Sequence, residues 1–212
     1  MTGRADLWAG LKLTLIISRG EAAPRAVIDL AEAAFAGGVT ALQLREKYGP
    51  TDRALFEQAL ELRGFCRERG RLFLVNDRLD LALAVEADGL HIGQQDLPAA
   101  AAARILPKSM LLGVSARTTA QAQMALAAGA DYLGVGAFFP TGSKTEAEVV
   151  DREAVREIVA LGAPVVAIGG LTEANAAEAW GLGVAGLAVI SALAQARDPR
   201  EAAAGLLCRP AV

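Results

Sequence analysis

The sequence predicts an α/β fold in which eight parallel strands, alternating with helices, close into one barrel. Short apolar runs of four to six residues, rich in Leu, Val and Ile, recur at 13–18, 41–45, 72–76, 89–92, 111–115, 132–136, 164–168 and 186–190. Near-continuous hydrophobicity is typical of strands that are covered on both faces, as in parallel sheets. Helical patterns lie between the runs, at 24–36, 51–69, 119–128, 151–161 and 173–180. We therefore expect residues 1–212 to form a single-domain (β/α)₈ TIM barrel.

A doubly wound open sheet is the alternative for alternating strands and helices. An open sheet concentrates functional residues at one switch point, whereas a barrel gathers them from the carboxyl ends of most strands. No Ser/Pro-rich linker divides the chain, and the phrases FAGGVTAL, LAAGADYL and WGLGVAGL each lead from a helix into a strand. The clearest helix lies at 119–128, where Thr118 or Thr119 caps the start and Gly129 ends it.

The composition excludes several classes of function. The chain is 53% hydrophobic, which is enough apolar surface to rule out disorder. A net charge of −3 argues against nucleic-acid binding, and no apolar stretch of about 20 residues is present to span a membrane. Cys66 and Cys208 match no metal or redox spacing, so we expect reduced thiols in a soluble, cytoplasmic protein. A homo-oligomer is compatible with these features.

Polar side chains follow the second predicted strand. Period-2 alternation sends Gln43, Arg45 and, if the extended geometry continues, Lys47 to the same side. In a barrel mouth, Arg and Lys are costly without an anion, so these residues predict an anionic ligand. The alternative is that Arg45, Glu46 and Lys47 are ordinary charges of a solvated loop.

Carboxylates follow the next two strands. Asn76 and Asp77 come directly after LFLV, and Asp96 follows GLHI. Asp77 and Asp96 are a plausible Mg²⁺ site, because this ion keeps several waters and takes few protein ligands plus phosphate oxygens. The alternative is helix capping, by Asp77 or Asp80 in one case and by Asp96, before Pro98, in the other.

The later strands also end in candidate residues. Ser115 ends the fifth strand, and a long loop after the sixth carries Thr141, Ser143 and Lys144. Such a loop is either a ligand clamp or an ordinary surface loop. His91, the only histidine, lies inside the fourth strand, and we interpret it as a packed, hydrogen-bonded residue rather than a ligand contact.

The last two strands end in Gly169-Gly170 and in Ile190-Ser191. In barrels, the loops after the seventh and eighth strands commonly bind phosphate through backbone N–H groups. Glycines allow the backbone to approach the anion closely. The predicted mouth therefore offers one site for a diphosphate with Mg²⁺ and one for a monophosphate, while Walker, dinucleotide, zinc and serine-hydrolase signatures are absent from the sequence.

These residues closely resemble the thiamine-phosphate synthase family over nearly the whole chain. The resemblance is carried, in order, by QLREK (43–47), NDR (76–78), DGLHIGQQDLP (88–98), GVS (113–115), GADYLGVGAFFPTGSK (129–144), VVAIGG (165–170) and AVISA (188–192). It implies a (β/α)₈ transferase that joins an aminopyrimidine-methyl diphosphate to a thiazole phosphate, with Mg²⁺ as cofactor. The products would be thiamine phosphate and pyrophosphate.

The resemblance also implies three groups of contacts. Asp77 and Asp96 correspond to Mg²⁺ ligands. The implied contacts of the pyrimidine diphosphate are Gln43, Arg45, Lys47, Asn76, Ser115 and Lys144, and those of the thiazole phosphate are Thr141, Ser143, Gly170, Ile190 and Ser191. The residues expected to act in catalysis are Arg45, Lys47, Ser115 and Lys144.

The sequence departs from the family in four places, one of which is the acidic segment with Glu146, Glu148 and Asp151, where the family commonly has a Gly. Ser143 stands where Thr is usual, Gln95 where an acidic residue is frequent, and Arg117 where His is frequent. A related thiazole tautomerase shares the fold but typically lacks the NDR carboxylate and depends on a His after the fifth strand. Asp77 and Asp96 are both present, and Arg117 stands in the segment where the tautomerase has its His, so the synthase is favoured. A tautomerase or a non-catalytic phosphate-binding barrel is the alternative.

Overall fold

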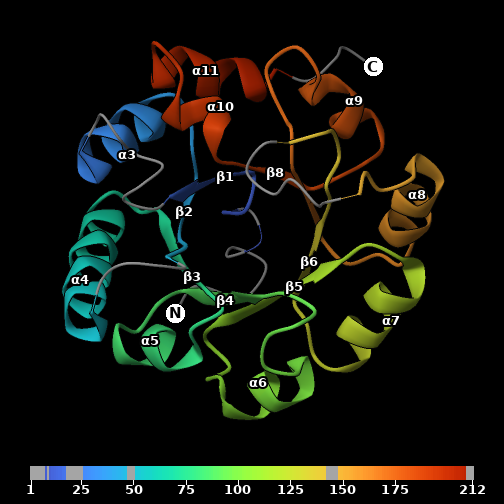
Figure 1. Ribbon diagram of the computed structural model, residues 1–212, viewed down its shortest axis with the longest axis horizontal. Helices are drawn as coiled ribbons and strands as arrows, with labels where there is room; N and C mark the ends of the chain where they lie inside the picture. Colours follow the sequence, from blue (N-terminus) through green and yellow to red (C-terminus); the bar gives the residue numbers. More distant parts are fainter. Residues whose placement is uncertain (1–7, 9, 18–25, 47–50, 142–147, 209–212) are drawn as a thin grey trace.

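A computed structural model describes residues 8, 10–17, 26–46, 51–141 and 148–208. Its centre is a closed barrel of parallel strands in chain order (Figure 1). The strands are β1 Leu13–Ile17, β2 Ala41–Leu44, β3 Leu72–Asn76, β4 Gly89–Ile92, β5 Leu111–Ala116, β6 Tyr132–Val135, β7 Val165–Ile168 and β8 Gly186–Val189. Because β1 pairs with both β2 and β8, the predicted barrel is confirmed and the open sheet is excluded.

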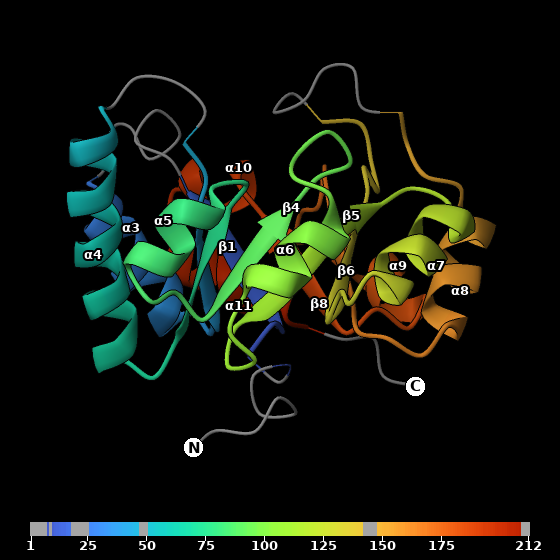
Figure 2. The same ribbon diagram turned by 90° about the horizontal axis from the view of Figure 1, so that it is seen from below.

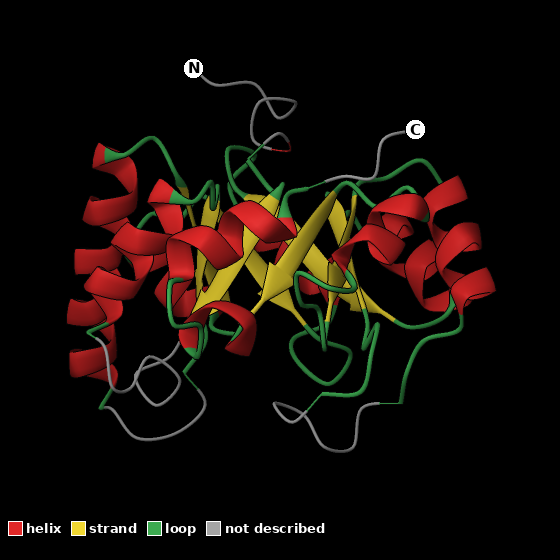
Figure 3. Ribbon diagram, turned by 90° about the horizontal axis from the view of Figure 1, so that it is seen from above, coloured by secondary structure: helices red, strands yellow, loops and turns green. Residues whose placement is uncertain are grey.

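Helices surround the barrel and cover the outer faces of its strands (Figures 1, 2 and 3). They are α3 Val27–Ala36, α4 Asp52–Glu68, α5 Leu79–Ala84, α6 Ala99–Ile105, α7 Thr119–Ala127, α8 Arg152–Ala160, α9 Ala176–Gly181, α10 Ser191–Ala194 and α11 Pro199–Leu206. Among the described residues, no helix is both long and apolar enough to cross a bilayer.

Local sequence patterns predicted some of the helix boundaries correctly and others not. Thr118 is the N-cap of α7, as one of the two predicted candidates, and its hydroxyl accepts from the Gln121 N–H at 3.2 Å. The helix predicted at 173–180 begins only at Ala176, because Asn175 Oδ1 accepts from the Thr172 N–H and holds a turn there. No residue range was predicted for helices α5, α6, α10 and α11; each has eight residues or fewer, too short to show a clear apolar period.

The alternative interpretation, in which Asp77 or Asp80 and Asp96 cap the helices after β3 and β4, is wrong. Arg78 is the N-cap residue of α5 and Pro98 that of α6, and neither helix has a side-chain cap. Asp77 and Asp96 lie outside the two helices, so their carboxylates remain at the ends of the strands. Asp80 lies in the first turn of α5 and pairs with Arg78.

The barrel has an apolar core on each side of its wall. The larger core lies between strands and helices and includes Phe73 and Phe138, which are fully buried. The smaller core fills the barrel interior with side chains that include Ile16, Leu74 and Leu111. Because side chains alternate between the two faces of a strand, this interior core identifies which polar residues also point inward.

Two interior glycines make room for two rings. A side chain on Gly113 would collide with the ring of Tyr132, and one on Gly134 would come within 2.7 Å of His91 Cε1. The strand register places His91 opposite Gly113, and Gly113 opposite Tyr132. The absence of a side chain at Gly113 of β5 and at Gly134 of β6 therefore allows an imidazole and a phenol to occupy the middle of the barrel.

We predict that Gly113→Ala destabilises the protein by about 1–3 kcal/mol, because the new methyl group must displace the Tyr132 ring. Urea unfolding measures the change. Gly64→Ala in α4 is the matched control, since nothing lies within 4 Å of its added carbon, and it should stabilise by about 0.5–1 kcal/mol. Equal stability of the wild type and Gly113→Ala would contradict the proposed packing.

Candidate active site

The carboxyl ends of the strands face one rim of the barrel, and β2 contributes an inward amide there. Gln43 is only 4% exposed and pairs in register with Ile16 and Leu74, both part of the interior core. The Arg45 N–H donates to Ile17 O at 3.0 Å, so the pairing with β1 continues past the end of β2. Arg45 is half-buried, which argues against a fully solvated loop at this point. Lys47 lies outside the described residues.

The chain turns sharply where β3 ends. Asn76 is half-buried and lies in register with His91, and Asp77 follows with φ of 62°. Asp and Asn are the non-glycine residues that best tolerate this left-handed conformation. The Asp77 N–H donates to His91 O at 2.8 Å, which fixes this turn against β4.

The loop after β4 folds back on itself. Asp96 Oδ2 accepts from the Gly93 N–H at 2.7 Å, so the carboxylate stays beside the end of β4. Gln94 Nε2 donates to Ser115 O at 2.6 Å and ties the same loop to β5. Asp77 and Asp96 thus belong to the ends of two adjacent strands.

These two carboxylates fit Mg²⁺ better than a metal that requires a full set of protein ligands. Among the described residues, no group of three or more His, Cys, Asp or Glu side chains is arranged to hold a metal ion. Mg²⁺ typically uses one or two carboxylates and completes its octahedron with water and substrate phosphates. The donor set of Asp77 and Asp96 therefore suits an ion shared with a phosphorylated ligand.

Arg78, which follows Asp77, is paired with two further carboxylates, those of Asp80 and Asp52. Its guanidinium donates to both oxygens of Asp80, at 2.8 and 2.6 Å, and to Asp52 at 3.0 Å. The hydrogen bonds from Arg78 lower the pKa of Asp80 to about 2. Asp80 is therefore an ion-pair partner that joins α5 to Arg78, and not a third metal ligand. The sequence analysis assigned no role to Arg78, since the contact with α4 depends on the tertiary fold.

A polar chain connects β4, β5 and β6 inside the barrel. His91 Nδ1 and the Tyr132 hydroxyl are 3.0 Å apart, and His91 Nε2 and Ser115 Oγ are 3.0 Å apart. Removal from water lowers the pKa of His91 to about 4, although the charge of Asp96 opposes the shift. Burial also raises the pKa of Tyr132. At neutral pH, both rings are therefore uncharged, and His91 holds the Ser115 hydroxyl in place.

His91 is thus packed and hydrogen-bonded, as predicted. Tyr132 was missed by the sequence analysis. Its only signal was a hydroxyl-bearing ring in an otherwise apolar strand, and its inward direction follows from the register with Gly113.

The segment after β6, which we call the β6–α8 stem (residues 137–141), lies across the end of β7. The N–H groups of Phe138 and Phe139 donate to Ile168 O and Gly169 O, both at 3.0 Å. The Val150 N–H donates to Ala137 O at 2.8 Å, which joins the two ends of the loop. The stem ends at Thr141, which is half-buried, whereas Ser143 and Lys144 lie outside the described residues.

Gly169 and Gly170 support the stem directly. Both have positive φ, and an added carbon on Gly170 would lie 2.6 Å from Pro140 O and 2.7 Å from Phe139 Cβ. The close approach that these glycines were predicted to allow for an anion is thus made, on this side, by the stem. Asn175 Nδ2 donates to Gly170 O at 2.9 Å and fixes the direction of this peptide.

The end of β8 opens onto a cavity. Ile190 is half-buried, and Ser191 begins α10 at the edge of a cavity of about 760 Å³. Its lining includes Thr172 and Glu173 from the loop after β7, and Gln195 from the α10–α11 connection. The exposed serine is therefore accessible to a ligand at the end of the barrel where β7 and β8 finish.

Among the departures from the family, Gln95 and Arg117 are exposed, whereas Ser143 lies outside the described residues. Gln95 lies in the loop after β4, and Arg117 follows β5. The Arg117 N–H donates to Gln121 Oε1 at 2.8 Å, so its backbone is held by α7.

Known proteins resemble this chain along most of its length. The model of a family described as "Thiamine monophosphate synthase" matches residues 13–193. A curated protein named thiamine-phosphate synthase from Moorella thermoacetica is 48% identical over 193 residues, which cover 90% of this chain and 91% of that protein. One of the same name from Chloroflexus aurantiacus is 47% identical and covers 88% of this chain and 85% of that protein.

Solved structures agree with the fold. The thiamine phosphate pyrophosphorylase from Pyrococcus furiosus superposes with a TM-score of 0.85 at 42% identity and covers 94% of this chain and 95% of that one. A 3-hexulose-6-phosphate synthase superposes with a TM-score of 0.67 at 17% identity and covers 92% of this chain and 98% of that one, a likeness of fold alone.

We predict that the neutral state of His91 makes stability depend on pH. Its pKa of about 4 in the folded protein is below the unfolded value of 6.5, so the unfolded chain binds the extra proton as pH falls. Stability is therefore retained above about pH 6.5 and lost below it. The difference in free energy of unfolding between wild type and His91→Gln should change by about 2 kcal/mol between pH 7 and 5, measured by urea unfolding.

The only histidine of the chain gives an independent check, because its imidazole can be titrated alone by NMR. A pKa near the ordinary value, or a wild-type and His91→Gln difference that does not vary with pH, would contradict the prediction.

Proposed function

The chain belongs to the thiamine monophosphate synthase family, and we propose that it couples 4-amino-2-methyl-5-(diphosphooxymethyl)pyrimidine to 4-methyl-5-(2-phosphooxyethyl)thiazole. The names of its relatives indicate the class of enzyme, a transferase that releases pyrophosphate. The products of the proposed reaction are thiamine phosphate and pyrophosphate.

One observation carries the proposal: inward polar groups of the family motifs lie on several strands, β2, β3 and β5, of one closed barrel. The amide of Gln43 is buried on β2, Asn76 ends β3, and Ser115 is hydrogen-bonded to His91 near the end of β5. A barrel enzyme builds its active site from this face. Two phosphorylated heterocycles are small enough to be held together there.

The diphosphate half is assigned to residues after β2, β3 and β4, with Lys144 from the loop after β6. Arg45, Lys47 and Lys144 would neutralise the leaving pyrophosphate, because preorganised positive charges favour a transition state in which negative charge accumulates on the leaving group. Asp77 and Asp96 would hold Mg²⁺, which when bound supplies further positive charge to the diphosphate oxygens.

The pyrimidine is assigned to the interior amide and hydroxyl groups. Gln43, Asn76 and Ser115 offer donors and acceptors to a planar, nitrogen-rich ring. The C–O bond to the diphosphate breaks with its electron pair leaving on pyrophosphate, and the amino group of the ring delocalises the positive charge on the methylene carbon. The thiazole nitrogen then donates its lone pair to form the new C–N bond.

This reaction removes no proton from carbon, so it does not require a strong base. A neutral His91 that positions the Ser115 hydroxyl, and does not act as a base, is compatible with such a reaction. The thiazole phosphate is assigned to Thr141, Ser143, Gly170, Ile190 and Ser191. Holding both substrates in line supplies much of the remaining rate.

Purified protein separates this proposal from its alternatives. With Mg²⁺ and both substrates, a synthase forms thiamine phosphate and releases pyrophosphate in equal amounts. A tautomerase acts on the thiazole phosphate alone and without Mg²⁺, and a binding protein forms no product. A cytoplasmic location and a homo-oligomeric state remain predictions.

We predict that Asp77→Asn lowers kcat/KM by at least about 100-fold at saturating Mg²⁺, because it removes a metal-ligand charge at the diphosphate. Asn tolerates the left-handed backbone at this position, where φ is 62°, so the fold and melting temperature should be retained. Asp80→Asn is the control, since Asp80 pairs with Arg78 instead. Undiminished activity of Asp77→Asn would remove Asp77 from the metal site.

We predict that Lys144→Ala lowers kcat more than it raises the KM for the thiazole phosphate, because its charge is assigned to the leaving pyrophosphate. Steady-state kinetics with each substrate varied in turn measure both constants. A large rise in the thiazole-phosphate KM at unchanged kcat would instead assign Lys144 to the other half of the site.

A further inference from the structure

Arg152, the first residue of α8, connects this helix to the β6–α8 stem and to α9. Its Nη1 donates to Phe138 O at 2.8 Å, and its Nε donates to Glu178 of α9. The guanidinium carbon also lies 5.1 Å from the ring centre of Phe138 and 4.7 Å from that of Phe139. The side chain is 26% exposed, so these contacts are partly shielded from water.

These contacts hold the β6–α8 stem from its outer side. On the inner side, the stem rests on Gly169 and Gly170, whose missing side chains allow Ala137, Phe139 and Pro140 to approach closely. The stem is thus held between β7 and the Arg152 guanidinium. A charged group placed over aromatic faces and bonded to a backbone carbonyl restrains both the rings and the chain.

The stem leads directly to Thr141, and Pro140 O lies over Gly170. The proposed function assigns Thr141 and Gly170 to the same ligand group, although they come from the segments after two different strands. The separation between them therefore depends on how the stem sits on β7. No atom of Arg152 itself is assigned to a substrate.

We propose that Arg152 is a positioning residue that seats the β6–α8 stem on Gly169-Gly170 and thereby sets the affinity of the site for the thiazole monophosphate. This inference rests on the proposed function and extends it to a residue outside the family motifs quoted above. It predicts a selective effect, because the pyrimidine-diphosphate contacts, apart from Lys144, come from strands β2–β5 and not from the stem.

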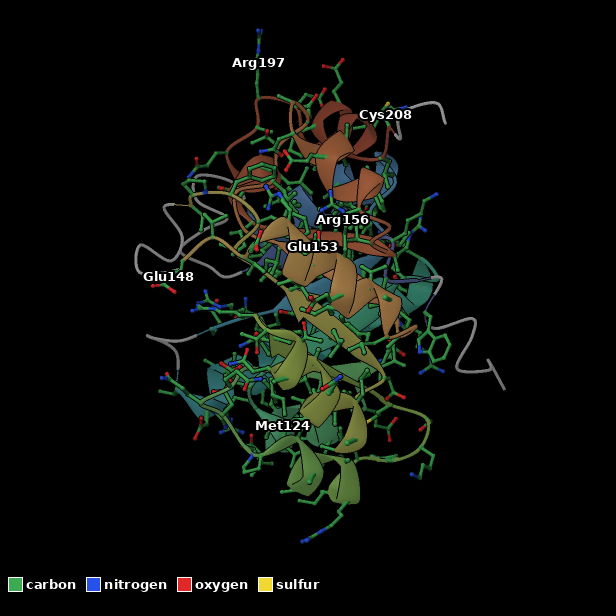
Figure 4. The ribbon with its side chains drawn as sticks, turned by 90° about the vertical axis from the view of Figure 1, so that its right-hand side faces the viewer. Met124, Glu148, Glu153, Arg156, Arg197 and Cys208 are labelled. Atoms are coloured by element: carbon green, nitrogen blue, oxygen red, sulfur yellow. The ribbon has the colours of Figure 1, made fainter. Side chains whose placement is uncertain are left out.

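The chain supplies a matched control on the same helix. Arg156 lies one turn beyond Arg152, is 57% exposed and pairs with Glu153 (Figure 4). Arg152→Gln removes the charge and the ring contact, whereas Arg156→Gln removes an equal charge from an exposed position. Arg152→Lys keeps a positive charge near the rings but loses the planar, multi-donor geometry.

The experiment measures the KM for each substrate, kcat, the melting temperature and the calorimetric affinity for the thiazole phosphate alone. Arg152→Gln should raise the thiazole-phosphate KM and dissociation constant by about tenfold, since small displacements remote from the reacting atoms have effects of this size or larger. The pyrimidine-diphosphate KM should change by less than about threefold, because only Lys144 of its contacts follows the stem. Arg152→Lys should be intermediate, and Arg156→Gln should match the wild type.

Two results would overturn the inference: an unchanged thiazole-phosphate affinity in Arg152→Gln, or a parallel loss of affinity for both substrates together with a lower melting temperature. Absence of product from the wild-type chain would instead refute the proposed function, and calorimetry would still test Arg152. If the wild type does not bind the thiazole phosphate, both proposals are wrong.

Discussion

Closure of the parallel barrel is the constraint on which the rest of the structure depends. Each neighbouring pair of strands is parallel, including the β1–β8 pair that closes the barrel, so all eight strands run in one direction around one axis. Every strand therefore ends at the same rim, and residues as distant in sequence as Gln43 and Ser191 belong to it. An open sheet would have separated these strand ends along its width, so the two-substrate site proposed above requires the closed form.

The barrel interior carries a second constraint, because a polar chain replaces part of an apolar layer. Gly113 and Gly134 make the space, and His91, Tyr132 and Ser115 occupy or border it with each hydroxyl hydrogen-bonded to the imidazole. Burial keeps the imidazole neutral, since the negative charge of Asp96 raises its pKa by less than desolvation lowers it. The result is a rigid hydroxyl near the mouth, suited to orienting a ring and not to abstracting a proton.

Features set by local sequence were predicted, whereas those set by contacts between distant elements were not. Period-2 alternation identified Gln43 as inward, and a strand position identified His91 as packed. The alternative that Asp77 and Asp96 cap helices is wrong because Arg78 and Pro98 take the N-cap positions, a difference of one or two residues. Arg152 carries no local signal at all, since its partners come from the segment after β6 and from α9.

Gly170 shows how one residue can satisfy two demands in this architecture. Its positive φ and absent side chain are required by the stem, because any side chain would collide with Phe139 and Pro140. The same backbone lies at the end of β7, where barrels commonly present N–H groups to a phosphate. In the proposed site, the monophosphate half would therefore depend on a chain segment that rests on a strand end, whereas the diphosphate half would use mainly the strand ends themselves. A perturbation of the stem should consequently affect the proposed monophosphate half more than the diphosphate half.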